Sequence, residues 1–148
     1  MSEHTEQVAL FRWATMRSNT IPALRMLLAI PNGSLRNKVT AARLKAEGLK
    51  SGVPDIVLPV PSGIYASLWI ELKRPKAPGK AKGVTSEVQR QWLGDLQSYG
   101  NCVGVCYGWD EARILIACMR IAAFTGSKID GLTMLSLIPC NHITRLLE

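Results

Sequence analysis

Two β-rich runs joined by a short turn constrain the fold of this chain more than any other feature. Residues 53–60 and 64–74 flank a turn centred on Gly63, an arrangement typical of a β-hairpin. An odd-numbered turn would place Asp55 directly opposite Glu71, whereas an even-numbered turn would send the two acids to opposite faces. Two prolines beside the turn cannot donate backbone hydrogen bonds, so the ladder is expected to loosen there.

The second run carries the tripeptide Glu71-Leu72-Lys73. Residues two apart in a strand share a face, so Glu71 and Lys73 project together while Leu72 points into the core. The core face of this strand is wholly apolar, with Leu68, Ile70 and Leu72. The strand therefore predicts a buried face on one side and a polar site on the other.

A hard divalent cation suits the polar side of this hairpin. The carboxylates of Asp55 and Glu71 and the main-chain carbonyl of Leu72 are oxygen ligands of the kind Mg²⁺ prefers. Lys73 could orient an attacking water or stabilise negative charge on a phosphate. The pattern indicates hydrolysis of phosphodiester bonds.

Each residue also has a structural explanation. Asp55 follows Pro54 and could simply begin a turn. Glu71 and Lys73 could form an ion pair on an exposed strand, which would contribute little to stability.

Positive charge is concentrated around the predicted site. The net charge is +7, and ten of the eighteen basic residues flank the hairpin acids. Before them come Arg36, Lys38, Arg43, Lys45 and Lys50, and after them Lys73, Arg74, Lys76, Lys80 and Lys82. Such clustering is the electrostatic footprint of a polyanion such as DNA, although a basic surface can also serve solubility alone.

The remaining pattern alternates helices with strands. Thr5 is expected to cap a first helix that carries Glu6 in its first turn. Residues 25–30 have the length of a short strand, and a basic helix is predicted over 37–47 with Gly48 just after it.

A second set of elements follows the hairpin. Ser86 opens a helix with apolar positions at helical spacing that ends at Gly100, residues 102–107 form a buried strand, and Asp110 caps a helix that ends near Phe124. The order predicts an α/β fold with a mixed central sheet flanked by helices.

The whole chain, residues 1–148, is expected to form a single domain, because 148 residues with 47% hydrophobic content suit one core. No apolar stretch reaches the roughly 18 residues of a membrane span. The cysteines are most simply reduced core thiols of a cytoplasmic protein. The tail from 125 to 148 has no readable pattern and could be an extra strand or a partner-binding segment.

Several motifs resemble those of one nuclease family. Gly52-Val53-Pro54-Asp55 followed by Leu68-Trp69-Ile70-Glu71-Leu72-Lys73 is similar to the PD-(D/E)xK signature, in a setting that resembles the VRR-NUC domain family and its small phage-encoded members. Further landmarks over residues 5–118 are Glu6-Gln7, Ile30-Pro31-Asn32-Gly33, Ser86-x-x-Gln89-x-x-Trp92 and Val105-Cys106-Tyr107-Gly108.

The resemblance implies a restriction-endonuclease-like fold and a Mg²⁺- or Mn²⁺-dependent DNA endonuclease of prokaryotic or phage-infected cells. Small stand-alone members act as homodimers on branched DNA such as four-way (Holliday) junctions. It also implies that Glu6 and Gln89 join the catalytic residues Asp55, Glu71 and Lys73.

Alternatives stay open for these assignments. Glu3 rivals Glu6 for the family position, and Gln89 with Ser86 also reads as a capping box. Residues expected to contact DNA are Asn32, Arg36, Lys38, Arg74, Lys76, Lys80 and Lys82. A basic module that binds DNA without cutting it, or a scaffold that binds a protein partner, would keep the same fold. No membrane or small-molecule cofactor is implied.

Overall fold

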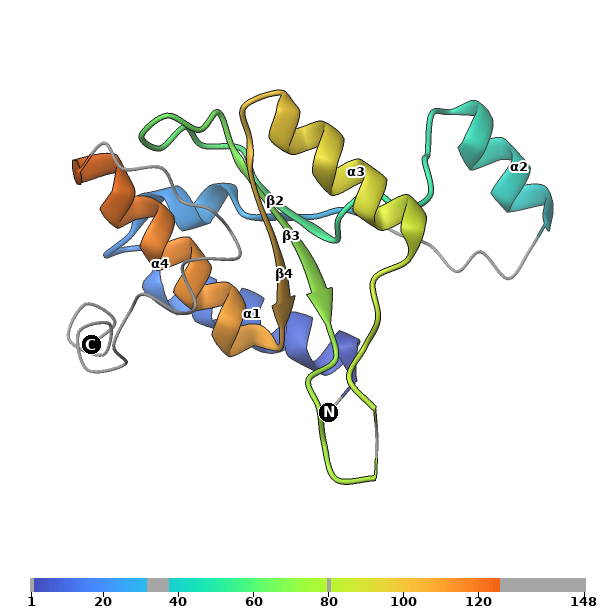
Figure 1. Cartoon of the computed structure of the whole chain (residues 1–148), viewed down its shortest axis with the longest axis horizontal. Helices are drawn as coiled ribbons and strands as arrows, with labels where there is room; N and C mark the ends of the chain where they lie inside the picture. Colours follow the sequence, from blue (N-terminus) through green and yellow to red (C-terminus); the bar gives the residue numbers. More distant parts are fainter. Residues whose placement is uncertain (1, 32–37, 80, 126–148) are drawn as a thin grey trace.

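The computed structural model describes residues 2–31, 38–79 and 81–125, without the side chains of 38–41 and 120–125 (Figure 1). The elements in chain order are α1 (Glu3–Arg17), the 3₁₀ helix η1 (Pro22–Met26), β1 (Leu28–Ala29), α2 (Lys38–Ala46), β2 (Ile56–Leu58), β3 (Leu68–Lys73), α3 (Glu87–Ser98), β4 (Cys102–Tyr107) and α4 (Trp109–Thr125).

Four strands form one mixed sheet in the order β1-β2-β3-β4. The β1–β2 and β2–β3 pairs are antiparallel, and β3 runs parallel to β4. The parallel pair follows from the connection between these strands, since α3 provides the crossover that returns the chain to the same end of the sheet. The predicted mixed α/β fold is confirmed.

The connection between β2 and β3 has an odd number of residues, as the prediction required. Ile56 pairs with Ile70 and Leu58 with Leu68, and continuing this register by one residue places Asp55 opposite Glu71. Gly63 lies at the centre of the connection with φ of +58°, a conformation that a glycine adopts without strain. The ladder ends at Leu58, as the prolines beyond it require.

Helices cover both faces of the sheet. One face packs on α1 and α4, and the buried cluster there includes Leu10, Trp13, Ile56, Leu58, Leu68, Ile70, Leu72, Ala112, Ile116 and Met119. On the other face lies α3, whereas α2 stands away from the sheet (Figure 1). The acids of the hairpin therefore face the α3 side.

Gly104 allows the close approach of α4 to the sheet. A Cβ atom at this position would lie 2.4 Å from Cδ2 of Leu115. Real Cβ atoms do not make contacts this short, so a larger residue would force Leu115 or the helix to move.

Three sequence-based boundaries were wrong. Ser2, not Thr5, caps α1, and Thr5 supplies the reciprocal half of the capping box. Residues 25–30 contribute only a two-residue strand, because residues 22–26 form η1 with Pro22 at its start. Asp110 does not cap α4, which begins one residue earlier at Trp109.

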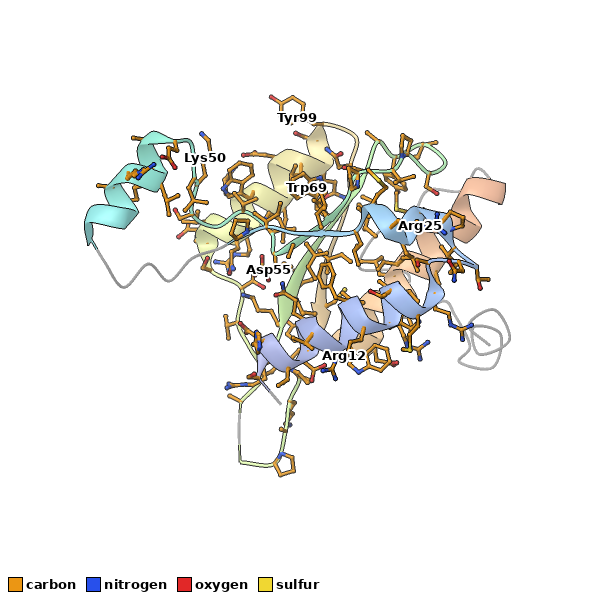
Figure 2. The ribbon with its side chains drawn as sticks, turned by 180° about the vertical axis from the view of Figure 1, so that it is seen from behind. Arg12, Arg25, Lys50, Asp55, Trp69 and Tyr99 are labelled. Carbon is orange, nitrogen blue, oxygen red and sulfur yellow. The ribbon has the colours of Figure 1, made fainter. Side chains whose placement is uncertain are left out.

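The helix α3 begins as predicted, and not all of its apolar residues are buried. Ser86 accepts a hydrogen bond from the Gln89 amide, which confirms the capping box. Leu93 is the buried residue of this helix, whereas Val88 and Tyr99 are exposed. Tyr99 points away from the molecule at the end of α3 (Figure 2).

The predicted buried strand over 102–107 is also only half buried. Cys102, Gly104 and Cys106 are buried, and the residues between them are partly accessible. Cys102, Cys106 and Cys118 are buried thiols without disulfides, as expected. Cys140 and the tail lie outside the described residues.

Among the helices of the described ranges, none is long and apolar enough to cross a bilayer.

Candidate active site

Asp55 lies immediately before β2 and is held against β3 by a main-chain hydrogen bond. Its Oδ2 accepts a hydrogen bond of 2.9 Å from the Leu72 amide, and its own carbonyl accepts one of 2.7 Å from the amide of Ile30. Asp55 is partly buried and is seen between α1 and α3 in Figure 2. The start of β2 thus becomes a fixed position for a carboxylate.

Glu71 and Lys73 form a buried ion pair on β3. The Lys73 Nζ lies 2.7 Å from Glu71 Oε1, and the two side chains are 8% and 0% exposed. Gln89 also donates to Oε1 of Glu71, while Oε2 is buried without a hydrogen-bond partner. The alternative explanation, that Glu71 and Lys73 form a weak ion pair on an exposed strand, is therefore wrong.

Glu71 is poorly suited to carry its charge in the metal-free protein. Burial raises the pKa of Glu71 to about 7, and the negative charge of Asp55 adds to the increase, although Lys73 opposes it. A carboxylate oxygen without a hydrogen-bond partner in such a place favours a cation that the protein itself does not supply.

Gln89 closes the cap of α3 and also contacts both members of the ion pair, while its catalytic role stays a prediction. Its Oε1 accepts hydrogen bonds from the Ser86 amide at 2.9 Å and from Lys73 Nζ at 3.2 Å, while its Nε2 donates to Glu71. The cap and the site use different atoms or lone pairs of one amide, so the two roles do not compete.

The main chain of Leu72 points toward Asp55. The Lys73 carbonyl accepts a hydrogen bond from Gly108, just beyond β4, and main-chain groups of successive strand residues face opposite sides. The Leu72 amide and carbonyl therefore both face β2, where the amide bonds Asp55. The three predicted oxygen ligands therefore lie near one another at the point where β2 begins.

Two carboxylates and one carbonyl fit a hard cation that keeps several of its waters, as Mg²⁺ does. Within the described ranges, no group of three or more His, Cys, Asp or Glu side chains could hold a metal. A site here would thus depend on Asp55, Glu71 and the Leu72 carbonyl, without a third acidic side chain.

Glu6 lies on α1, and its side chain reaches the start of α4. The residue is 2% exposed, and its Oε2 accepts a 2.9 Å hydrogen bond from the Trp109 amide. A carboxylate at a helix N-terminus is favoured by the helix dipole, so Glu6 caps α4 from another helix. Its Oε1 is buried without a partner. The catalytic role of Glu6 stays a prediction.

Glu3, the rival of Glu6, lies just beyond the C-terminal end of β3, which carries Lys73. Its Oε1 accepts a 3.3 Å hydrogen bond from the Arg74 amide in an exposed position. Between the two acids, only Glu6 is buried.

The predicted DNA contacts are only partly described. Asn32, Arg36 and Lys80 lie outside the described residues, and Lys38 begins α2 with its side chain undescribed. Lys76 is exposed, and Lys82 places Nζ 3.3 Å from the centre of the Tyr107 ring.

Arg74 turns back onto its own loop rather than outward. Its Nη2 donates a 3.0 Å hydrogen bond to the Ala81 carbonyl, and the Gly83 amide donates to the Arg74 carbonyl. These two bonds hold together the base of the segment that projects from the sheet between β3 and α3 (Figure 1).

Tyr107 and Arg90 were not identified from the sequence as site residues. Both line a cavity beside β4, together with Lys82. The signal that could have found Tyr107 is the alternation along β4, because Val103, Val105 and Tyr107 share one face.

Comparison with known proteins identifies the family. A solved structure described as a VRR_NUC domain protein has the same fold, with a TM-score of 0.65 and 22% sequence identity over 88% of this chain and 94% of the other. A search of curated proteins finds no significant match. The family model of the VRR-NUC domain matches residues 4–110. The chain therefore belongs to the VRR-NUC domain family, a nuclease-type family.

Proposed function

We propose that this protein is a metal-dependent DNA endonuclease that hydrolyses phosphodiester bonds, with Mg²⁺ or Mn²⁺ as its cofactor. The observation that carries the proposal is the cluster around the buried Glu71, at the start of β2. There, Glu71 keeps one oxygen without a hydrogen-bond partner beside Asp55, Lys73 and Gln89. Membership of a nuclease-type family supports it.

Asp55, Glu71 and the Leu72 carbonyl would hold the cation. A bound cation neutralises charge on the phosphate and lowers the pKa of water, which supplies the nucleophile for hydrolysis. The protein orients its ligands in advance, because the Leu72 amide fixes Asp55 and Gln89 fixes Glu71.

Lys73 supplies the positive charge of the site. Its ammonium is held between Glu71 and Gln89 at 2.7 and 3.2 Å, so it is already oriented before DNA arrives. A preorganised cation in a partly dry site stabilises the negative charge that develops on the phosphate more strongly than a solvated cation does. Lys73 is the residue that we assign to this role.

We propose branched DNA, such as four-way junctions, as the preferred substrate of a homodimer. Two-fold related sites would match the paired, symmetric strands of a junction. The basic residues on both sides of the hairpin support a wide DNA footprint. Lys76 and Lys82 on the projecting segment, and the other predicted contacts, would bind the backbone without reading its sequence.

Incubation of the purified protein with labelled junction, duplex and single-stranded DNA tests the proposal. Cleavage is expected with Mg²⁺ or Mn²⁺ and not with EDTA. Lys73→Ala is expected to lose cleavage by at least about 100-fold while still binding DNA. Arg25→Ala, an exposed change of the same charge on η1, serves as the control.

Binding without cleavage by either metal would instead identify a non-cutting DNA-binding module, and the absence of both would indicate a scaffold. Because Lys73→Ala leaves a buried carboxylate without its partner, circular dichroism must show that the variant is folded. Glu71→Gln, which buries no unpaired negative charge, provides a second loss-of-cleavage variant.

A further inference from the structure

A cavity lies beside the candidate active site, between α3 and β4. Its volume is about 540 Å³, within the roughly 300–1,000 Å³ that is usual for ligand sites. Leu93 from α3 and Val103 and Val105 from β4 provide apolar lining. The proposed chemistry uses none of these side chains.

The strand register connects this cavity to the site. Val105 pairs with Glu71 and Tyr107 with Lys73 in the parallel ladder. Paired residues of neighbouring strands share a face and lie about 5 Å apart. The cavity therefore begins one strand away from the ion pair, on the same face of the sheet.

The polar groups of the cavity are mainly cationic. Lys82 and Arg90 line it, and Lys82 lies over the Tyr107 ring with Nζ 3.3 Å from the ring centre. Gln97 adds an amide at the exposed side of α3. The carboxylate of Glu111 also lines the cavity, but it accepts a 2.7 Å hydrogen bond from the Tyr107 amide, which fixes one of its oxygens.

We propose that this cavity receives one unstacked base of the DNA strand, next to the phosphate that is cut. An apolar interior accommodates the faces of a base, and Arg90 and Lys82 attract the flanking phosphates. Lys82 covers the Tyr107 ring in the free protein, so its move to a phosphate would free that ring as a stacking partner. The proposal rests on the proposed function, because it takes DNA as the substrate.

The inference gives a physical reason for a preference for DNA with unpaired nucleotides. A base inside a duplex must lose its pairing and stacking before it can enter such a cavity, whereas a base that is already unpaired avoids much of this cost. The cavity therefore favours substrates with unpaired nucleotides near the cut, without any reading of sequence.

Binding of single-stranded oligonucleotides in EDTA tests the cavity without cleavage. One oligonucleotide carries ordinary bases, and a second of the same length carries abasic sites at its centre. The wild-type protein is expected to bind the first at least about fivefold more tightly, since one base–aromatic stack contributes this much or more. Fluorescence anisotropy measures both affinities.

Val103→Trp and Gln97→Trp should fill the cavity and abolish this preference for bases. Gln97 is exposed, so its substitution is not expected to disturb folding even if Val103→Trp does. Val8→Trp is the matched control, because Val8 lines a separate cavity of about 520 Å³ on α1. The control should keep the wild-type preference.

Equal affinity of the wild-type protein for the two oligonucleotides would overturn the inference. So would a preference for bases that survives in the folded Gln97→Trp variant. Junction cleavage with Mg²⁺, measured in parallel, separates the two proposals. A wild-type protein that cuts DNA but ignores the bases refutes the cavity alone, and one that neither binds nor cuts DNA refutes both.

Discussion

Glu71→Gln is expected to stabilise the metal-free protein at pH 8 while removing its activity. The wild-type side chain is fully buried, and burial raises its pKa from the usual 4.5 to about 7. A glutamine keeps the shape, and its oxygen can still accept from Lys73 and Gln89. Its amide can donate toward Asp55, whose charge contributes to the raised pKa.

The size of the effect follows from proton linkage. Between pH 4.5 and pH 7 the folded protein binds more protons at Glu71 than the unfolded chain does, so its stability falls as the pH rises through this window. The penalty that Glu71 imposes is about 1 kcal/mol at pH 5 and at most about 3 kcal/mol at pH 8. Substitution by glutamine removes it.

Thermal unfolding in EDTA at pH 5 and pH 8 measures the difference. For a chain of this size, 3 kcal/mol corresponds to an increase of roughly 6–12 °C in the unfolding midpoint of the variant at pH 8. The increase at pH 5 should be about a third as large. Glu87→Gln controls for the loss of one negative charge, because Glu87 is exposed in the first turn of α3.

Addition of Mg²⁺ should reduce the difference between the unfolding midpoints of the Glu71→Gln variant and the wild type. A cation that binds the folded protein raises its midpoint, and this increase should occur in the wild type and be absent in the variant. A Glu71→Gln variant that is no more stable than the wild type at pH 8 would refute the reasoning. An identical difference at pH 5 and pH 8 would do so as well.

Three further predictions concern DNA affinity, the contact of α4 with the sheet, and the core thiols. Lys82→Ala should weaken DNA binding in EDTA and reduce the salt dependence of the affinity by about one charge, and an unchanged salt slope would exclude Lys82 from the footprint. Gly104→Ala should lower the free energy of unfolding by about 1–3 kcal/mol in denaturant titrations, because its Cβ would overlap Leu115. The same change should cost less when it is made in a protein that already carries Leu115→Ala. Burial raises the pKa of Cys102 to about 11, so peptide mass spectrometry should find it unmodified by iodoacetamide at pH 8 until the protein is denatured; rapid reaction in the native state would contradict this.

The hairpin could be predicted because its determinants are local. A glycine at the centre of the connection and a strand period of two fix whether Asp55 and Glu71 share a face, and the observed register agrees. The α3 cap is equally local, since Ser86 and Gln89 are three residues apart. Such features need no knowledge of the rest of the chain.

The features that the sequence did not predict depend on distant contacts or on near-equivalent local choices. Glu6 caps α4 through a hydrogen bond to Trp109, 103 residues away, and no local pattern announces that contact. Ser2 and Thr5 are both good capping residues. The helix begins at Glu3 with Ser2 as its cap, because both hydroxyl groups then form hydrogen bonds in the capping box. The half-burial of Tyr107 depends on how α3 lies over β4.

Gln89 joins the folding of α3 to the chemistry of the site. The same side chain closes the cap of the helix and holds both members of the buried ion pair. Any displacement of the N-terminus of α3 therefore disturbs Glu71 and Lys73 at once, and the same helix provides one wall of the cavity beside β4. The cap and the contact with the ion pair, which the sequence presents as alternatives, therefore occur together. Glu71 and Lys73 are positioned by the start of a helix rather than by a flexible loop.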